Sequence, residues 1–392
     1  MNTVFEKMDD IFEKSPNFGI FLCLSTLFAP TLALLKRLDK KNYIPHLQFF
    51  STKDFKKNAP ETIKESLEKH NDLYTSSKEN EDHITEKRKQ EYADMVQRFY
   101  NLVTDFYTYA WGYSFHFAPR FKTESFQESI KRYEYYLSNQ LGLSKNMKCL
   151  DVGCGVGGPM RNIANFSGAN IDGVTINAYQ AEIGRKKNKE MHLEEQCKLH
   201  EGDYQHLSFL DNTFDAAFAI ESTCHSPDKK QVFSEIFRVL KPGARFADYE
   251  WILTEKFDYE NKNHIKIKKE IEIGNGIPDL TTKDEILGAL EEVGFKIEKH
   301  FDANANLHAM NEIPWYHELN QELVWDNFKT SFVGRFITSA ALFVLEKSQV
   351  VPKGSTSVSM LLAKTATYLV KAGKEEIFTP SYFIVAVKPD VK

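Results

Sequence analysis

The chain has 392 residues, of which 42% are hydrophobic and 27% charged, and its formal net charge is −5. This length exceeds that of one ordinary domain, so we expect one large domain with additional segments. The acidic balance argues against nucleic acid as the main partner, and five cysteines without metal-ligand or disulfide spacing indicate a reducing compartment and no bound metal.

The N-terminal region contains an uncharged, largely apolar stretch from Ser15 to Leu35, long enough to span a bilayer although Pro30 interrupts it. Acidic residues precede the stretch and basic residues follow it. This pattern argues against a cleaved signal peptide and places the carboxyl side in the cytosol. We predict that residues 1–42 form a membrane anchor that spans the bilayer or lies on it. The alternative is a helix packed on the protein's own surface.

Residues 43–93 form a charged linker or helix by composition, because Lys, Glu, Asn and Ser dominate from residue 51 onward. The pattern predicts a solvated helix over residues 53–69 and a flexible linker over residues 75–82. We assign no function to these charges.

A dense run of aromatic side chains extends from Phe99 to Phe117, where ten of nineteen positions are Phe, Tyr, Trp or His. Much of such a run belongs to a core, but Tyr, Trp and His carry polar tips that a plain core does not need. Asp105 and His116 lie within the run. We predict a substrate lid whose rings wall an apolar pocket, and aromatic faces also stabilise cations.

The sequence LDVGCGVGGP at residues 150–159 indicates an apolar strand, an acid and a glycine-rich turn that enters a helix. Glycine tolerates positive φ and has no Cβ, so a ligand can approach the bare backbone. A dinucleotide site would have the spacing G-x-G-x-x-G. The acid followed by G-x-G-x-G is instead typical of Rossmann-like methyltransferases that use S-adenosylmethionine; tight packing alone is the remaining alternative. The residues assigned to the methyl donor here are Asp151, Gly153, Cys154, Gly155 and Gly157.

The following segments alternate in the order that a doubly wound sheet requires. We predict strands over residues 169–176, 214–220 and 245–251, and a helix over residues 228–240. Ligands of such sheets bind at the carboxyl ends of the strands, where this chain has several polar side chains. Those assigned to the donor are Asn177 and Gln180 for its hydroxyls, Asp203 near its adenine, and Tyr204 and Glu221.

The C-terminal part completes an α/β fold. A helix over residues 282–293 with a capping start precedes strand 295–301, and strand 382–387 is predicted to be the last, antiparallel edge strand. Helical stretches over residues 319–328, 335–345 and 358–371 predict a cap over the pocket or a surface for a homo-oligomer. We therefore predict a Rossmann-like class I methyltransferase fold with a helical cap and an N-terminal apolar segment. Its core with the aromatic lid covers residues 94–302, and the cap with the last strand covers residues 303–392.

From about residue 95 onward the chain resembles the sterol methyltransferases, typified by the sterol C-24 methyltransferases. Residues 107–117 read YTYAWGYSFHF, and the family's motif is Y-E-x-G-W-G-x-S-F-H-F, so Thr108 replaces Glu and Ala110 replaces Gly. The match continues in one register through LDVGCGVGGP, GVTIN, AIESTCH, EIFRVLKPG, YEW, IEIGNGIP, IPWY and FTP. The resemblance implies S-adenosylmethionine as the donor and a sterol as the substrate. We expect the protein on the endoplasmic reticulum membrane or a lipid droplet, with the catalytic domain facing the cytosol.

The chemistry that the resemblance implies needs no base for methyl transfer, because a Δ24 side-chain alkene attacks the sulfonium methyl directly. The resulting carbocation lies in an apolar pocket, where aromatic faces such as Tyr109 contribute about 0.5–2 kcal/mol each. A base must then remove a proton to regenerate an alkene. The candidates, which the sequence does not rank, are Asp105, His116, Glu221 and His225.

Three other functions remain open. The missing carboxylate at Thr108 leaves the methylated carbon uncertain, so a sterol C-4 methyltransferase is one alternative. A methyltransferase for another lipid or a nitrogen headgroup would need a polar pocket, against which the aromatic run argues. A non-catalytic lipid-binding protein would not need the intact glycine turn and the polar residues at the strand ends.

Overall fold

The computed structural model describes residues 63–74, 81–305, 312–319, 332–348 and 351–390. Its main sheet has the strand order β4-β3-β2-β5-β6-β10-β8, and β7 pairs with β6. β10 is antiparallel to both of its neighbours, and the other pairings are parallel. The predicted Rossmann-like methyltransferase fold is thus confirmed. The strands are β2 (Lys148–Val152), β3 (Asn170–Thr175), β4 (Cys197–Glu201), β5 (Phe214–Ile220), β6 (Leu240–Leu253), β7 (Thr281–Thr282), β8 (Lys296–Asp302) and β10 (Phe378–Val387).

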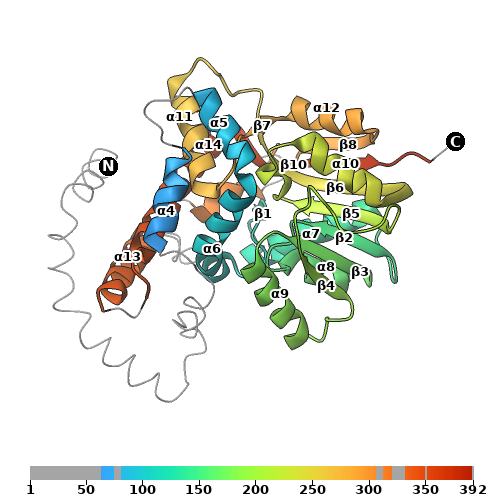
Figure 1. Ribbon diagram of the computed structural model, residues 1–392, viewed down its shortest axis with the longest axis horizontal. Helices are drawn as coiled ribbons and strands as arrows, with labels where there is room; N and C mark the ends of the chain where they lie inside the picture. Colours follow the sequence, from blue (N-terminus) through green and yellow to red (C-terminus); the bar gives the residue numbers. More distant parts are fainter. Residues whose placement is uncertain (1–62, 75–80, 306–311, 320–331, 349–350, 391–392) are drawn as a thin grey trace.

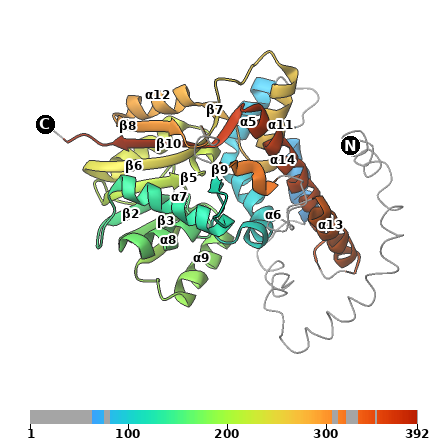
Figure 2. The ribbon, with the colours of Figure 1, turned by 180° about the vertical axis from the view of Figure 1, so that it is seen from behind.

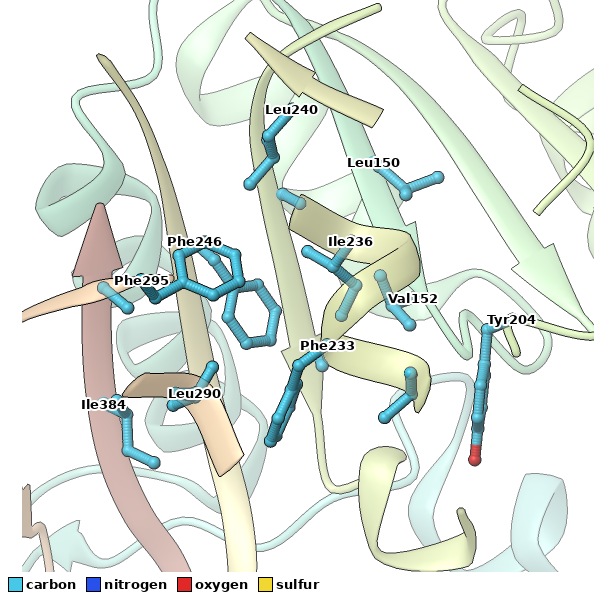
Figure 3. Close-up of a cluster of buried hydrophobic side chains, with 14 of the residues drawn as sticks. Leu150, Val152, Tyr204, Phe233, Ile236, Leu240, Phe246, Leu290, Phe295 and Ile384 are labelled. Carbon is cyan, nitrogen blue, oxygen red and sulfur yellow. The ribbon is translucent and has the colours of Figure 1, made fainter. Parts of the chain in front are cut away.

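Helices cover both faces of this sheet (Figure 1; Figure 2). On one face, α10 (Lys229–Val239) and α12 (Lys283–Val293) pack on the strands through the cluster in Figure 3, which includes Phe233, Phe246 and Leu290. On the other face, α7 (Phe126–Leu141) and α8 (Gly158–Ser167) form a second cluster. Burial on both faces explains why β5 reads as an almost unbroken apolar run.

The last strand differs from its prediction. β10 lies between β6 and β8 and is buried along nearly its whole length, so it is not an edge strand. The edge is β8, whose residues are mostly exposed and whose sequence carries Lys296, Lys299 and His300. Charged side chains on an edge strand discourage pairing with other chains, which accounts for the difference between these two strands.

A cap of helices lies at the carboxyl ends of the parallel strands, and its helices come from before the first strand of the main sheet, from between β6 and β7 and from before β10 (Figure 1). α6 contains most of the aromatic run, and α11 packs against α14, which also contacts α13. The cap helices are α4 (Ile63–Asp72), α5 (Glu81–Gln90), α6 (Tyr92–Trp111), α11 (Lys262–Asn275), α13 (Phe332–Lys347) and α14 (Ser355–Glu375). Two short strands, β1 (Arg120–Phe121) and β9 (Glu312–Ile313), pair beside it. Helix α9 (Ala178–Glu190) follows β3.

The composition of the charged N-terminal region predicts a solvated segment, but three of its side chains are buried in the fold. His70, Tyr74 and Arg88 are each at most 1% exposed. Their side chains reach three carbonyl groups at the end of α11 and just beyond it. His70 Nε2 lies 2.7 Å from Ile273 O, Tyr74 Oη donates to Ile277 O at 2.9 Å, and Arg88 Nε donates to Pro278 O at 2.8 Å. Helices α4 and α5 are therefore fixed to α11.

Among the residues that the structure describes, no helix is both long and apolar enough to cross a membrane. The apolar stretch at residues 15–35 lies outside the described residues, as do most of the predicted helix over residues 53–69, residues 75–80 of the predicted linker and nearly all of the predicted helix over residues 319–328.

Candidate active site

Two cavities adjoin where the cap meets the sheet. The strand-end cavity is formed by the glycine turn after β2, by residues that follow the other parallel strands and by the first half of α6. The aromatic cavity is formed by the second half of α6, the end of β6 and α14. They contain about 730 and about 1210 Å³ of space between the atoms, including solvent at their open mouths. Five residues line both cavities: Tyr100, Phe115, His116, Glu221 and His225.

The glycine turn brings bare backbone to the strand-end cavity. Gly153, Gly155 and Gly157 have φ angles of 81°, 53° and 74°, in the region that favours glycine. Gly153, Cys154 and Gly155 line the cavity, whereas Gly157 is the N-cap of α8 and lines neither cavity. A Cβ at Gly153 would lie 2.5 Å from the Cβ of Ser222, so the turn also packs tightly on the end of β5.

Asp151 lies at the end of β2 but lines neither cavity. It is 3% exposed, and its Oδ2 has no hydrogen-bond partner among the described residues. Burial, followed by the negative charge of Glu134, raises the pKa of this carboxyl group. A buried polar atom ordinarily has a partner, so Asp151 retains one acceptor position.

The structure separates the two amide side chains that the sequence assigns to the donor. Gln180 lines the strand-end cavity. Asn177 is fully buried and lines neither cavity. Its Oδ1 accepts a hydrogen bond from the backbone N–H of Gln180 at 2.9 Å and caps α9. Its Nδ2 donates to Gln97 O at 3.1 Å and to Asn101 Oδ1 at 2.8 Å, which fixes α9 to α6.

Asp203 and Tyr204, which the sequence assigns to the donor, follow β4 and line the strand-end cavity. Asp203 accepts hydrogen bonds from the backbone N–H of Gln205 at 2.8 Å and from the hydroxyl of Tyr92, the first residue of α6. The hydroxyl of Tyr204 donates to Ser222 O at 3.1 Å. Helix α6 therefore closes on the carboxylate that the sequence assigns to the adenine.

Glu221 directly follows β5 and lies at the boundary between the cavities. Its φ angle is 52°, a left-handed conformation that is costly for a residue with a Cβ and is concentrated at functional sites. Its Oε1 accepts from the backbone N–H of Phe117 at 2.7 Å, and its Oε2 accepts from Trp251 Nε1 at 2.8 Å. Burial raises the pKa of Glu221 to about 8, although these hydrogen bonds and the charge of His116 act in the opposite direction.

His116 is held as a cation. Its Nδ1 lies 3.0 Å from Phe117 O, and its Nε2 lies 3.2 Å from Glu134 Oε1. Both partners are acceptors, so both ring nitrogens carry protons. The hydrogen bond to Glu134, whose negative charge adds to it, outweighs burial and raises the pKa of His116. Since a doubly protonated ring has no lone pair to accept a proton, His116 lines both cavities without being suited to the base role.

His225 is held as a neutral ring in the 3₁₀ turn that follows β5. Its Nδ1 lies 3.0 Å from Gly276 O, and its Nε2 lies 2.9 Å from the hydroxyl of Tyr100. Burial lowers the pKa of His225 to about 4. Because a carbonyl oxygen can only accept, Nδ1 carries the proton and Nε2 accepts from Tyr100.

The other two predicted catalytic residues lie on α6 in different surroundings. Tyr109 lines the aromatic cavity and is 46% exposed. Asp105 lines neither cavity, and its Oδ1 accepts from the hydroxyl of Tyr179 on α9 at 2.8 Å. Thr108, where the family motif has Glu, is also absent from both linings and donates back to Thr104 O at 2.8 Å.

The aromatic cavity has a mainly apolar wall. Ring contacts join its two sides, because Phe117 lies 5.8 Å from Trp111 and 6.1 Å from Trp251, measured between ring centroids. Leu362, Ala366 and Leu369 complete the wall from α14. Its carboxyl and imidazole groups, on Glu221, His116 and His225, lie on the side that it shares with the strand-end cavity, and the cap helices add the neutral polar side chains of Asn275, Thr338, Ser359 and Thr365.

Two family models match this chain. A model of the methyltransferase domain matches residues 150–247, and a model described as sterol methyltransferase C-terminal matches residues 325–390. The chain is 45% identical over 306 residues to cycloartenol-C-24-methyltransferase from Arabidopsis thaliana, which covers 78% of this chain and 90% of that protein. The chain belongs to the sterol methyltransferase family.

A further relative and two solved structures are also similar to this sterol methyltransferase. The sterol 24-C-methyltransferase of Saccharomyces cerevisiae is 43% identical over 313 residues, covering 78% of this chain and 81% of that protein. Among solved structures, the cyclopropane synthase MmaA2 from Mycobacterium tuberculosis has a TM-score of 0.58 at 17% identity, covering 76% of this chain and 98% of that one. Geranyl diphosphate C-methyltransferase from Streptomyces coelicolor has a TM-score of 0.54 at 16% identity, with the same coverages. At these identities the two structures show the fold alone.

The methyl donor of this sterol methyltransferase is S-adenosylmethionine, which supplies an electrophilic methyl group on a positively charged sulfur. The strand-end cavity fits such a molecule. Gly153 and Gly155 offer backbone without side chains, Gln180 and Asp203 offer polar groups, and Glu221 offers a carboxylate toward the aromatic cavity. A carboxylate at this boundary complements a positive charge.

The sequence reasoning did not select three residues of this site. Tyr100 lines both cavities, Tyr92 binds Asp203, and Trp251 binds Glu221. One signal was present for Tyr100, because residues 100, 107 and 111 share a face of a helix by their spacing. No local signal links Trp251 to a residue thirty positions earlier.

Proposed function

We propose that this protein transfers the methyl group of S-adenosylmethionine to C-24 of a sterol that carries a Δ24 side-chain alkene. The observation that carries the proposal is the contact between the apolar aromatic cavity and the strand-end cavity at a carboxylate, Glu221. The names of the relatives, cycloartenol-C-24-methyltransferase and sterol 24-C-methyltransferase, support the same substrate and the same carbon.

The residues of this chain suit each stage of that reaction. The apolar walls hold a sterol by excluding water, which also protects a carbocation from capture. The rings of Tyr107, Trp111 and Phe115 offer faces that stabilise a cation by about 0.5–2 kcal/mol each. Holding the alkene against the donor in the correct orientation lowers the barrier further. Glu221 supplies negative charge beside the path along which positive charge moves from sulfur to carbon.

The test is an assay of purified full-length protein with isotope-labelled donor and a panel of sterols that have or lack the Δ24 alkene. We expect label only in sterols with the alkene, and mass spectrometry should locate it on the side chain. Label on the ring system of sterols with a saturated side chain would show methylation of the nucleus and would overturn the proposal.

We also propose that the protein works on a membrane surface, namely the endoplasmic reticulum membrane or a lipid droplet, with the catalytic domain in the cytosol. The sequence of residues 15–35 and the water-insolubility of sterols support this. Flotation with phospholipid vesicles should recover the full chain with the vesicles and leave a variant lacking residues 1–42 largely behind. Equal recovery of the two proteins would contradict the anchor role.

A further inference from the structure

Tyr100 occupies the point at which the two cavities adjoin. It lies on the third turn of α6, its side chain lines both cavities, and its hydroxyl is 2.9 Å from His225 Nε2. The two rings meet edge to face at a centroid distance of 5.4 Å. A group that passes from one cavity to the other therefore crosses a boundary that Tyr100 helps to form.

The direction of the hydrogen bond between these rings is fixed from the far side of His225. Gly276 O accepts from Nδ1, so the lone pair of the neutral ring is on Nε2 and the Tyr100 hydroxyl donates to it. Gly276 ends α11 in the left-handed conformation, and a Cβ there would lie 2.8 Å from the ring of Phe99. The carbonyl that orients His225 is thus held by packing as well as by the backbone.

The two other candidate bases on the shared boundary are already engaged. Both carboxylate oxygens of Glu221 accept hydrogen bonds from N–H groups, and both ring nitrogens of His116 donate. The Tyr100 hydroxyl, by contrast, donates its proton to His225 and accepts no hydrogen bond from another described residue, so its oxygen can still accept a proton. A hydroxyl arranged in this way can take up one proton and pass on another.

We propose that Tyr100 and His225 form a proton relay that ends the reaction. The proton of a C–H bond next to the sterol cation moves to Tyr100 Oη, while the hydroxyl proton of Tyr100 moves to His225 Nε2. The electron pair of the broken C–H bond becomes the second bond of the product alkene. Tyr100 is neutral before and after the step, and the positive charge passes from the sterol to His225. This inference rests on the proposed function and adds the group that accepts the proton.

The acidity of the partners suits this order. A proton beside a carbocation is so acidic that a neutral phenol hydroxyl accepts it, provided that a second group removes the phenol's own proton. Burial keeps the pKa of His225 near 4, so the ring releases the proton to water after the product has formed. The same burial that makes His225 a weak base therefore allows it to be neutral again for the next turnover.

The test compares Tyr100→Phe with Tyr74→Phe. Tyr74 is a matched control because its buried hydroxyl also donates a hydrogen bond, to Ile277 O at 2.9 Å, but it lines neither cavity. We expect Tyr100→Phe to bind the donor normally in calorimetry but to form the alkene at least about 100-fold more slowly, as when a general base is lost. Mass spectrometry should reveal a methylated alcohol formed by capture of the cation by water, and Tyr74→Phe should give the normal product.

A second variant keeps the test independent of Tyr100 itself. If the two side chains act as one unit, the variant His225→Gln should show the same alcohol, and the double variant should be no slower than Tyr100→Phe alone. Additive losses, or an unchanged product from Tyr100→Phe, would overturn the relay. A wild-type protein that methylates no Δ24 sterol would instead overturn the proposed function.

Discussion

The charge of Glu221 should make binding of the methyl donor depend on pH in a way that binding of the demethylated product does not. Burial raises the pKa of Glu221 to about 8, so much of the ligand-free protein is protonated there at pH 7. A sulfonium beside the carboxylate favours the ionised form, because opposite charges attract more strongly at a buried site. The proton must leave when the donor binds, and affinity should therefore increase with pH and level off above about pH 8.

The magnitude follows from the pKa. Between pH 7 and pH 9 the ionised fraction of a group with this pKa rises about tenfold, which corresponds to about 1.4 kcal/mol of binding free energy. S-adenosylhomocysteine has the same adenosine and amino-acid parts but a neutral sulfur, so titrations of those parts cancel when the two ligands are compared. The ratio of the two dissociation constants isolates the sulfonium charge.

The assay is isothermal titration calorimetry of both ligands in matched buffers from pH 6.5 to pH 9.5. We expect the Kd of S-adenosylmethionine to fall about tenfold relative to that of S-adenosylhomocysteine between pH 7 and pH 9, and about thirtyfold across the whole range. Glu221→Gln should remove the pH dependence of the ratio of the two dissociation constants. If the dependence persisted in this variant, the neighbouring cation His116 would be its cause. A ratio that stays constant with pH in the wild-type protein would refute the assignment of Glu221 to the sulfonium.

Three further predictions concern the fold and the glycine turn. Gly153→Ala should lower the denaturant midpoint of unfolding because its Cβ would lie 2.5 Å from the side chain of Ser222. Gly155→Ala should fold and should weaken donor binding in calorimetry. Equal denaturant midpoints for the two variants would contradict this prediction. Chemical unfolding should show a loss of about 1 kcal/mol for Tyr74→Phe and about 3 kcal/mol for Arg88→Leu, and unchanged values would mean that α4 and α5 are not fixed to α11. Burial lowers the pKa of His70 to about 4, so unfolding takes up a proton below about pH 6.5, and stability should fall as pH decreases from there to 4. His70→Gln, which retains an N–H donor, should have a shallower dependence, and an identical slope would exclude His70 as a cause.

The elements of the core were predictable because their signals are local. Strand 214–220 was predicted at its observed bounds, and the capping box of Thr282 and Glu285 marks the start of α12 in the sequence. The position of β10 was not predictable in this way. Its place between β6 and β8 depends on pairings with residues 80 to 142 positions earlier. An apolar strand has the same sequence pattern at the edge of a sheet or inside it.

The candidate site was predictable to the extent that strand ends dictate it. Gly153, Gly155, Asp203 and Glu221 line cavities because parallel strands of a doubly wound sheet bring their carboxyl ends together. Asp105 was selected because it lies in the aromatic run, but its direction depends on how α6 is rotated against α9. That rotation is fixed by tertiary contacts that no local pattern displays.

Protonation states could not be ranked from sequence for the same reason. His116 and His225 both lie in motifs that this chain shares with the family, yet one is held as a cation and the other as a neutral ring. The difference comes from Glu134 and Gly276, which lie 18 and 51 positions away from the respective histidines. Only the folded chain brings these acceptors to the rings.

The charges on the shared boundary suit a reaction that carries one positive charge from beginning to end. His116 is a cation, but Glu134 lies against it and compensates its charge. Glu221 adds a titratable carboxylate, and His225 is neutral. A positive charge that begins on sulfur, passes to carbon and leaves as a proton therefore meets no uncompensated cation among these residues. The charge begins near the carboxylate of Glu221 and ends, by way of Tyr100, on the neutral imidazole of His225. This arrangement gives the transfer of charge one direction.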